Sequence, residues 1–250
     1  MKKKRIISAL LAGTMLIGAQ QVWAATEHYN DSSLTGNADE WNAYVAGWNN
    51  LANDYTQVSL TPGCAATELN FAWYNPGTTG SPVVYFGTDP QNLQEYTGTS
   101  SSVDPSLTGG NPYCYNYVTV TGLRENTTYY YAVNKSGVVS PTETYRTGSF
   151  ESVNILYVGD PQVGASKGQV QGSETLTETS GAANTAARND GFAWDRTLDI
   201  ALEQNPNINF MISAGDQVNN TGNAKEEEYA AYLSASALKS LPTATTIGNH

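Results

Sequence analysis

The sequence predicts a β-sandwich followed by an α/β domain with parallel strands, both behind an N-terminal export signal. Short alternating runs separated by Gly, Pro and Asn turns fill residues 55–147, at the regular spacing typical of a sandwich. After Thr147 the pattern becomes strand, helix, strand, helix, strand, which is the order of a parallel α/β sheet. Each strand of this second part is followed by a glycine and a polar side chain.

The first 25 residues have the three regions of a cleaved secretory signal. Residues 1–5 are basic after Met1, residues 6–19 are apolar, and small residues follow at Ala24 and Ala25. The apolar run is shorter than the roughly 20 residues that span a bilayer, so a retained anchor is the weaker alternative. We expect a secreted protein, extracellular or periplasmic, with no membrane association after signal cleavage.

The charge of the chain excludes one class of partner. Four of its 12 Lys and Arg residues lie in the signal, so eight remain against 23 Asp and Glu. Nucleic acid and anionic lipid need clustered Lys and Arg. We therefore expect no nucleic-acid partner.

A helical segment over residues 26–54 precedes the sandwich. Its apolar residues recur at helical spacing behind Asn37 and Asp39 as possible caps, and they are Trp41, Tyr44, Val45, Trp48 and Leu51. The stripe favours a packing surface over a binding site.

The sandwich at residues 55–147 contains a recognisable corner. The expected strands are Glu68–Trp73, Val83–Phe86, Tyr115–Val120, Tyr129–Val133 and Glu143–Tyr145. Residues 123–129, Leu-Arg-Glu-Asn-Thr-Thr-Tyr, resemble the Leu-x-Pro-x-Thr-x-Tyr corner of fibronectin type III domains, with Glu125 at the usual proline position. By that resemblance the Tyr129 hydroxyl would bond to nearby backbone.

The two cysteines, Cys64 and Cys114, both lie in the sandwich. Export makes exposed thiols a liability, so we favour a disulfide, with two free thiols as the alternative.

The α/β part, residues 151–250, has alternating strand and helix patterns. The expected strands are Val153–Val158, Ile208–Ile212 and Ala244–Ile247, and the expected helices are Asp190–Gln204 and Ala224–Leu241. The first strand is almost continuously apolar, which predicts cover on both faces. The polar stretch Pro161–Asn189 is long for a loop, and it indicates either a substrate mouth or an insertion without a role.

The polar residues after these strands predict a metal site. They are Asp160, Asp216, and Asn249 with His250, each group preceded by glycine. Ligands of parallel sheets bind beyond the carboxyl ends of the strands, so we expect these side chains along one rim. Carboxylate, amide oxygen and imidazole suit Fe, Mn, Zn or Mg, and one aspartate can bridge two such ions.

The set Gly159-Asp160, Gly215-Asp216 and Gly248-Asn249-His250 resembles the opening motifs of calcineurin-like metallophosphoesterases. With a fibronectin-like sandwich in front, the chain is similar to the purple acid phosphatases. The resemblance implies a fibronectin type III-like sandwich followed by an incomplete α/β metallophosphoesterase domain. It also implies that Asp160 binds one metal, Asp216 bridges both, Asn249 binds the second, and His250 acts catalytically at the leaving group.

Two positions depart from that pattern. Purple enzymes have an iron-binding tyrosine three residues after the bridging aspartate, where this chain has Asn219. The second departure is Gln162, where the wider family has histidine and the purple enzymes glycine. Asn219 and Gln162 are weaker candidate metal ligands. Because Asn219 replaces the tyrosine, we expect no tyrosinate colour.

The family takes further histidine ligands from motifs later than the third, which ends at His250. We therefore expect the 250-residue chain to be a fragment that is inactive by itself. For the whole protein the resemblance implies an acid phosphatase-like phosphomonoesterase with a small phosphate ester as substrate. A phosphodiesterase or nucleotidase, and a non-catalytic surface-binding module, remain the alternatives.

Overall fold

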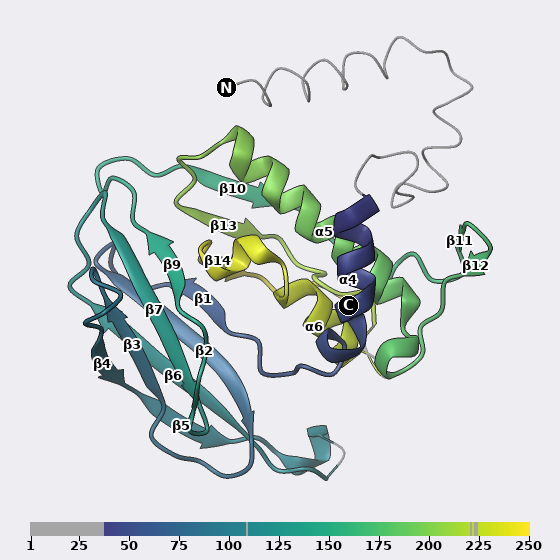
Figure 1. The fold of residues 1–250 in the computed structure, drawn as a ribbon, viewed down its shortest axis with the longest axis horizontal. Helices are drawn as coiled ribbons and strands as arrows, with labels where there is room; N and C mark the ends of the chain where they lie inside the picture. Colours follow the sequence, from purple (N-terminus) through teal and green to yellow (C-terminus); the bar gives the residue numbers. More distant parts are fainter. Residues whose placement is uncertain (1–37, 109, 221, 223–224) are drawn as a thin grey trace.

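The computed structural model describes residues 38–108, 110–220, 222 and 225–250 (Figure 1). The expected signal, residues 1–25, and His28 lie outside this part of the chain. None of the helices in the described residues is long and apolar enough to cross a membrane.

Residues 59–146 form two antiparallel sheets, which lie to the left in Figure 1. One has the strand order β1-β2-β6-β5, and the other the order β4-β3-β7-β8 with β9 also paired to β7. The strands are β1 (Ser59–Pro62), β2 (Glu68–Pro76), β3 (Val83–Gly87), β4 (Gln94–Thr97), β5 (Thr99–Ser102), β6 (Tyr113–Thr121), β7 (Thr128–Lys135), β8 (Val138–Val139) and β9 (Glu143–Arg146). A short 3-10 helix, η1 (Pro105–Thr108), precedes β6.

Side chains from both sheets share one core. Alternation places Leu69, Phe71 and Trp73 of β2 inside, in one cluster with Val84 and Phe86 of β3 from the other sheet, each almost fully buried. The five expected strands are all present, as β2, β3, β6, β7 and β9. The N-terminal part is therefore β-rich and antiparallel, as predicted.

The corner at residues 123–129 has the expected hydrogen bond. The backbone N–H of Arg124 donates to the Tyr129 hydroxyl at 2.7 Å. The ring of Tyr129 is buried and stacks on Phe86 with centroids 4.8 Å apart. Glu125 occupies the proline position and accepts a hydrogen bond from the Phe150 N–H at 3.3 Å.

Replacing Tyr129 by phenylalanine should destabilise the protein by about 1–2 kcal/mol, because the ring stays and the Arg124 N–H loses its acceptor. Urea unfolding measures the change. Tyr130→Phe, at the neighbouring position, is the matched control and should change the free energy of unfolding by less than about 0.5 kcal/mol. Equal losses of unfolding free energy in the two variants would contradict a stabilising role for the hydrogen bond between Arg124 and Tyr129.

The expected disulfide is wrong, because both cysteines are free. Cys64 follows β1, whose last residue pairs with Leu69 at the start of β2. Cys114 pairs with Asn75 near the other end of β2. Six residues of strand separate these points, about 20 Å at 3.3 Å per residue, whereas a disulfide needs Cα atoms within about 7 Å.

The α/β part contains a parallel sheet in the order β10-β13-β14. Its strands are β10 (Ile155–Val158), β13 (Phe210–Ser213) and β14 (Thr243–Thr245). The helices are α5 (Thr185–Gln204) and α6 (Lys225–Leu233), followed by the 3-10 helix η3 (Ser236–Lys239).

The helices differ from their expected bounds at one end each. α5 begins at Thr185, five residues earlier than predicted, because the Asn184 side chain caps it by accepting the Ala187 N–H at 2.9 Å. α6 ends at Leu233 rather than continuing to Leu241. The chain turns there because Ser236 donates its N–H to Asp195 of α5 at 2.7 Å, which directs η3 back along that helix.

The expectation that the first strand is covered on both faces is wrong for the described structure. β10 is an edge of its sheet, and Ile155 and Tyr157 are 46% and 70% exposed. Only the face that carries Leu156 and Val158 packs against the helical core. The continuous apolar run predicted that both faces of this strand are buried, but none of the described residues covers the face that carries Ile155 and Tyr157.

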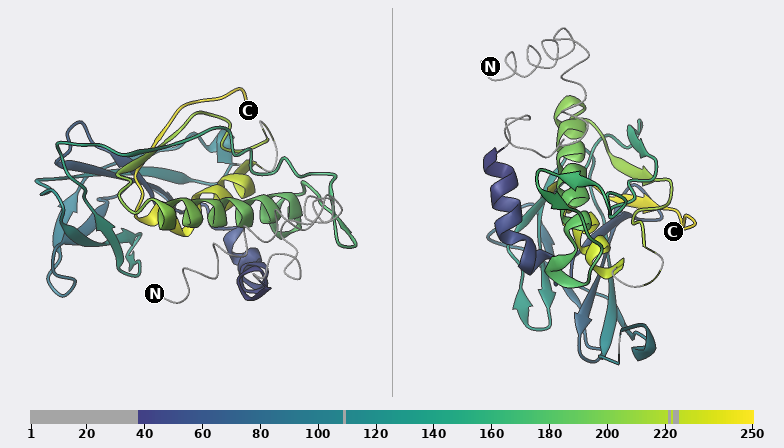
Figure 2. Two further views of the ribbon diagram at one scale, coloured as in Figure 1. Left: turned by 90° about the horizontal axis from the view of Figure 1, so that it is seen from above. Right: turned by 90° about the vertical axis from the view of Figure 1, so that its right-hand side faces the viewer.

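The N-terminal helix α4 (Ala38–Leu51) packs beside α5, as both views in Figure 2 show. Trp48 is 3% exposed in the core of the α/β part and donates its indole N–H to the Ala182 carbonyl at 2.9 Å. Trp41 meets Phe192 of α5 edge-on at 5.1 Å. The apolar stripe is a packing surface, as predicted.

The stretch Pro161–Asn189 has structure of its own. It contains the hairpin β11 (Val170–Gln171) and β12 (Glu174–Thr175), the 3-10 helix η2 (Gly181–Ala183) and the first turn of α5. Ion pairs from Lys167 to Glu178 at 2.7 Å and from Arg188 to Glu174 at 2.6 Å connect its parts.

Candidate metal centre

The three parallel strands end next to one another, so the residues that follow them share one rim. Val158, Ser213 and Thr245 are register partners across the sheet. β13 is the central strand, which places the segment of Asp216 between the segments of Asp160 and Asn249. This order suits the bridging position predicted for Asp216.

The segments after β10 and β13 remain paired beyond the sheet. The Gln162 N–H donates to the Asp216 carbonyl at 2.9 Å, and the Val163 N–H donates to the Gln217 carbonyl at 3.2 Å. The Asn219 N–H returns a bond to the Val163 carbonyl at 3.0 Å. These bonds fix the first two candidate motifs relative to each other.

Gln162 and Asp216 both have a φ of 42°, in the left-handed region that non-glycine residues seldom adopt. Such a conformation costs on the order of 1–3 kcal/mol per residue and is found mainly where surrounding structure enforces it. Here the hydrogen bond between the two residues holds them both. Backbone strain of this kind is concentrated at functional sites.

Asp216 is 9% exposed, and its carboxylate lies against the third motif. Its Oδ1 accepts the backbone N–H of His250 at 3.0 Å. A Cβ at Gly248 would overlap the Asp216 carboxylate, so only glycine permits this approach. Gly215 has a φ of 114°, whereas nothing lies within 4 Å of a Cβ at Gly159. Two of the three motif glycines are thus required by the structure.

The imidazole of His250 is oriented by the second motif. Its Nδ1 lies 2.6 Å from the Asn219 carbonyl oxygen. A carbonyl only accepts, so Nδ1 carries the proton in this contact and Nε2 is the atom left for other chemistry.

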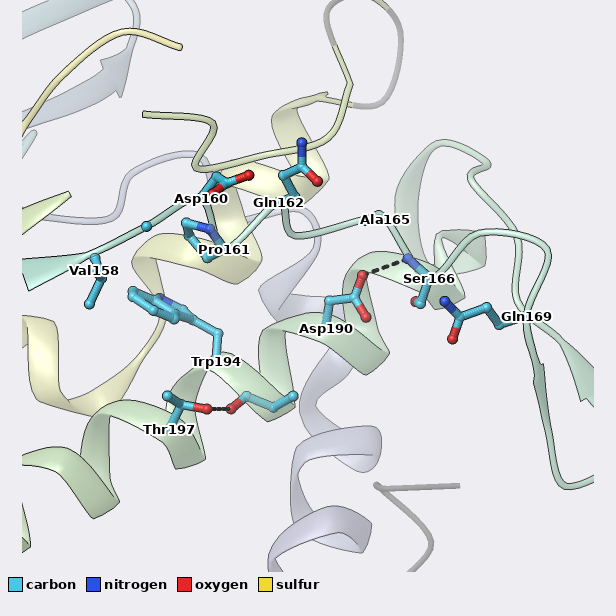
Figure 3. Close-up of a pocket in the computed structure, with 12 residues that line it drawn as sticks. Val158, Asp160, Pro161, Gln162, Ala165, Ser166, Gln169, Asp190, Trp194 and Thr197 are labelled. Carbon is cyan, nitrogen blue, oxygen red and sulfur yellow. Dashed lines mark hydrogen bonds between the residues drawn. The ribbon is translucent and has the colours of Figure 1, made fainter. Parts of the chain in front are cut away.

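Asp160 and Gln162 line a hollow of about 620 Å³ between their loop and α5. Figure 3 shows the Asp160 carboxylate and the Gln162 amide on the same side of the loop, away from Trp194 of α5. Ser166 and Gln169 of the stretch Pro161–Asn189 also line this hollow. That stretch therefore contributes to the surface beside Asp160.

The structure brings the candidate residues together to different degrees. Asp216 contacts His250 directly, and it contacts Gln162 through backbone. Asp160 and Asn249 are exposed at the ends of the flanking strands. No three His, Cys, Asp or Glu side chains of the described residues are grouped so that they could hold a metal ion.

Two helical carboxylates, which no motif in the sequence indicated, hold these loops. Asp190 of α5 accepts the N–H groups of Gly164 and Ser166 at 2.9 and 3.0 Å. Glu228 of α6 accepts those of Asn219 and Asn220 at 3.0 and 2.7 Å. Glu228 stands in the acidic run Glu226–Glu228 at the start of α6, and nothing in the sequence of that run indicated that it is buried.

Burial raises the pKa of Glu228 from 4.5 to about 7. The two backbone N–H groups stabilise the carboxylate and offset part of this shift, and the charges of Glu178 and Asp190 add to it.

Comparisons with known proteins agree with this architecture. Residues 55–147 match the family model "Purple acid Phosphatase, N-terminal domain". Among solved structures, purple acid phosphatase PPD1 from seeds of yellow lupin (Lupinus luteus) matches with a TM-score of 0.52 and 15% identity, over 77% of this chain and 35% of that one. A structure of PhoD matches with a TM-score of 0.46 and 14% identity, over 79% of this chain and 40% of that one. No curated protein matches the sequence at a significant level.

The fold and the family match together define a protein with an antiparallel β domain in front of a parallel α/β sheet, arranged as in a purple acid phosphatase. Residues 55–147 match a purple acid phosphatase N-terminal domain, and the chain is similar in fold to part of a purple acid phosphatase. It spans about a third of the length of the lupin enzyme.

Proposed function

We propose that this protein is an exported, metal-dependent hydrolase of phosphate esters, acting on small phosphomonoesters through a dinuclear metal centre. One observation carries the proposal. The buried Asp216 is central on a rim that also holds Asp160, Asn249 and His250, behind a purple acid phosphatase N-terminal domain.

The residues on the rim fit a metal pair in part. Two carboxylates, an amide oxygen and an imidazole suit Fe, Mn, Zn or Mg, and the two cysteines, Cys64 and Cys114, lie in the antiparallel β domain. Asp160 would bind one ion, Asp216 both, and Asn249 the second, with Gln162 and Asn219 as further candidates. Three principal ligands are few for two ions, so the proposal needs ligands beyond this set. When bound, the metal pair supplies the Lewis acidity that activates water and offsets phosphate charge.

The chain's own groups account for orientation and proton supply. The His250 N–H holds Asp216 Oδ1, which leaves Oδ2 for coordination. The Asn219 carbonyl holds the Nδ1 proton of His250, so a protonated ring would donate from Nε2 to the departing alkoxide. The acidic chain, with eight basic against 23 acidic residues after the expected signal, favours small esters over polyanionic nucleic acid.

Metal removal tests the proposal. We expect the protein expressed from its complete gene to release p-nitrophenol from p-nitrophenyl phosphate. Activity should be lost after dialysis against a chelator and restored by Mn²⁺, Zn²⁺ or Fe²⁺. A faster reaction with bis(p-nitrophenyl) phosphate would instead favour a phosphodiesterase. Absence of any metal-dependent hydrolysis would favour a non-catalytic surface module.

Iron loading should leave the protein without the purple colour of its relatives, because Asn219 stands at the tyrosine position. The Asn219 carbonyl instead accepts a hydrogen bond from His250, and the Asn219 N–H donates to the Val163 carbonyl and to Glu228. Absorption spectroscopy of the iron-loaded protein should show no tyrosinate charge-transfer band. Asn219→Tyr is the informative companion variant, and a visible band in the unmodified protein would contradict the assignment.

A further inference from the structure

We propose that Glu228 is a positioning residue, which fixes the loop after β13 and through it the ring orientation of His250. The inference rests on the proposed function for its purpose. The orientation of the ring can be measured directly, so the inference can fail or succeed independently of hydrolysis.

Glu228 is fully buried, with 0% of its surface exposed, and it joins α6 to the rim. Its Oε2 accepts the N–H groups of Asn219 and Asn220 at 3.0 and 2.7 Å. A single carboxylate oxygen therefore orders two consecutive peptide units, three and four residues after Asp216. Above its pKa of about 7, where the carboxylate is ionised, these bonds are roughly twice as strong as neutral ones.

The other oxygen reaches the loop after β10. A Cβ at Gly164 would overlap Oε1 of Glu228, and Gly164 has a φ of 109° that other residues rarely adopt. Oε1 has no hydrogen-bond partner among the described residues. Glu228 thus fills the space between the loop of Asp160 and the loop of Asp216. That space is available because Gly164 has no side chain.

The connection to His250 runs through one peptide unit, which joins Asn219 to Asn220. Its N–H, on Asn220, donates to Glu228 at 2.7 Å, and its carbonyl, on Asn219, accepts the Nδ1 proton of His250 at 2.6 Å. Because the peptide unit is planar, fixing its N–H also fixes the carbonyl that selects the Nδ1–H tautomer. If packing alone were needed, an apolar side chain would fill the site without the cost of a buried carboxylate.

Glu227 provides a matched comparison on the same helix. It is also buried, at 4% exposure, and its Oε1 accepts the backbone N–H of Gly181 at 2.7 Å. Gly181 belongs to η2, and its hydrogen bonds join it to Glu227 and Asn184 rather than to the rim motifs. Loss of either glutamate removes a buried carboxylate, but only Glu228 is connected to His250.

The decisive measurement is the tautomer of His250, read from long-range ¹H–¹⁵N spectra of the metal-free chain at a pH where the ring is neutral. A His28→Gln variant assigns the signals. The unmodified chain should show the Nδ1–H form. Glu228→Leu should move His250 toward the Nε2–H form that a free histidine side chain prefers. Glu228→Gln should retain the Nδ1–H form, because the amide oxygen can accept the same two N–H groups.

The controls separate positioning from general stability. Glu227→Leu should lower the melting temperature while His250 stays in the Nδ1–H form. In protein that hydrolyses p-nitrophenyl phosphate, Glu228→Leu should lower kcat about 10–100-fold and Glu228→Gln much less. An unchanged tautomer in Glu228→Leu, or an equal change in Glu227→Leu, would overturn the proposal.

A second measurement covers the case in which Glu228→Leu does not fold. The Asn220 amide should exchange with solvent as slowly as the buried amides of α6, since Glu228 is its acceptor. Exchange as fast as in an exposed loop would overturn the proposal. Slow exchange, together with an unchanged tautomer in Glu228→Gln, would support it.

Discussion

Asp216→Asn is expected to abolish tight metal binding and to lower phosphate-ester hydrolysis by at least about 100-fold, since changes behind the ligands alone cost metal sites about 10–100-fold. Asparagine is the sharpest replacement because it removes only the charge. It tolerates the left-handed φ of 42° at this position, and its Oδ1 can still accept the His250 N–H at 3.0 Å. The fold should therefore survive while the bridging ligand is weakened.

Calorimetric titration with Mn²⁺ measures the binding, and p-nitrophenyl phosphate measures the hydrolysis. Asp195→Asn is the matched control, because Asp195 lies on α5, where it bonds Ser236 away from the rim. It should leave both quantities unchanged. Wild-type hydrolysis by Asp216→Asn would refute the dinuclear assignment.

Gly248→Ala should have a comparable effect on the site, although it adds only a methyl group. That group would overlap the Asp216 carboxylate and the Asp216 backbone nitrogen. Either the carboxylate or the segment that carries Asn249 and His250 must move. We expect at least a tenfold loss of hydrolysis, on the order of the effect of a misplaced catalytic group, and a stability loss of about 1–3 kcal/mol.

Gly159→Ala is the control for this substitution, because a Cβ there meets nothing within 4 Å and the residue has no positive φ. Its hydrolysis and its melting temperature should match those of the unmodified protein. The close approach of Gly248 to Asp216 would have no functional meaning if both alanine variants behaved alike.

The strands that bury one face were predictable from the sequence, because alternation reports burial directly. The alternation of apolar and polar residues is clear in five strands, β2, β3, β6, β7 and β9. By contrast, β4 and β5 are short, polar and mostly exposed. The end of α6 was not predictable, because a contact from Ser236 to Asp195, 41 residues away, decides it. Cys64 and Cys114 show the same limit, since their separation depends on strand register.

The rim was predictable for a different reason. The carboxyl ends of parallel strands must lie along one edge of the sheet. Asp160, Asp216 and Asn249 could therefore be assigned to that edge without knowledge of any interatomic distance. The groups that orient them could not be found in this way. Glu228 is a charged residue at a fully buried helical position, and nothing local distinguishes it from its exposed neighbour Glu226.

The contact between Trp48 and Ala182 has a consequence for the order of folding during synthesis. It joins residues 134 positions apart, with the entire antiparallel β domain between them. The helix α4 is made first, but its core neighbours on α5 leave the ribosome only after that domain is complete. Because early closure of so long a loop is entropically unfavourable, the β domain should fold before α4 finds its place. A protein cut at residue 55, where the family match begins, would lose part of the hydrophobic interior of its second half.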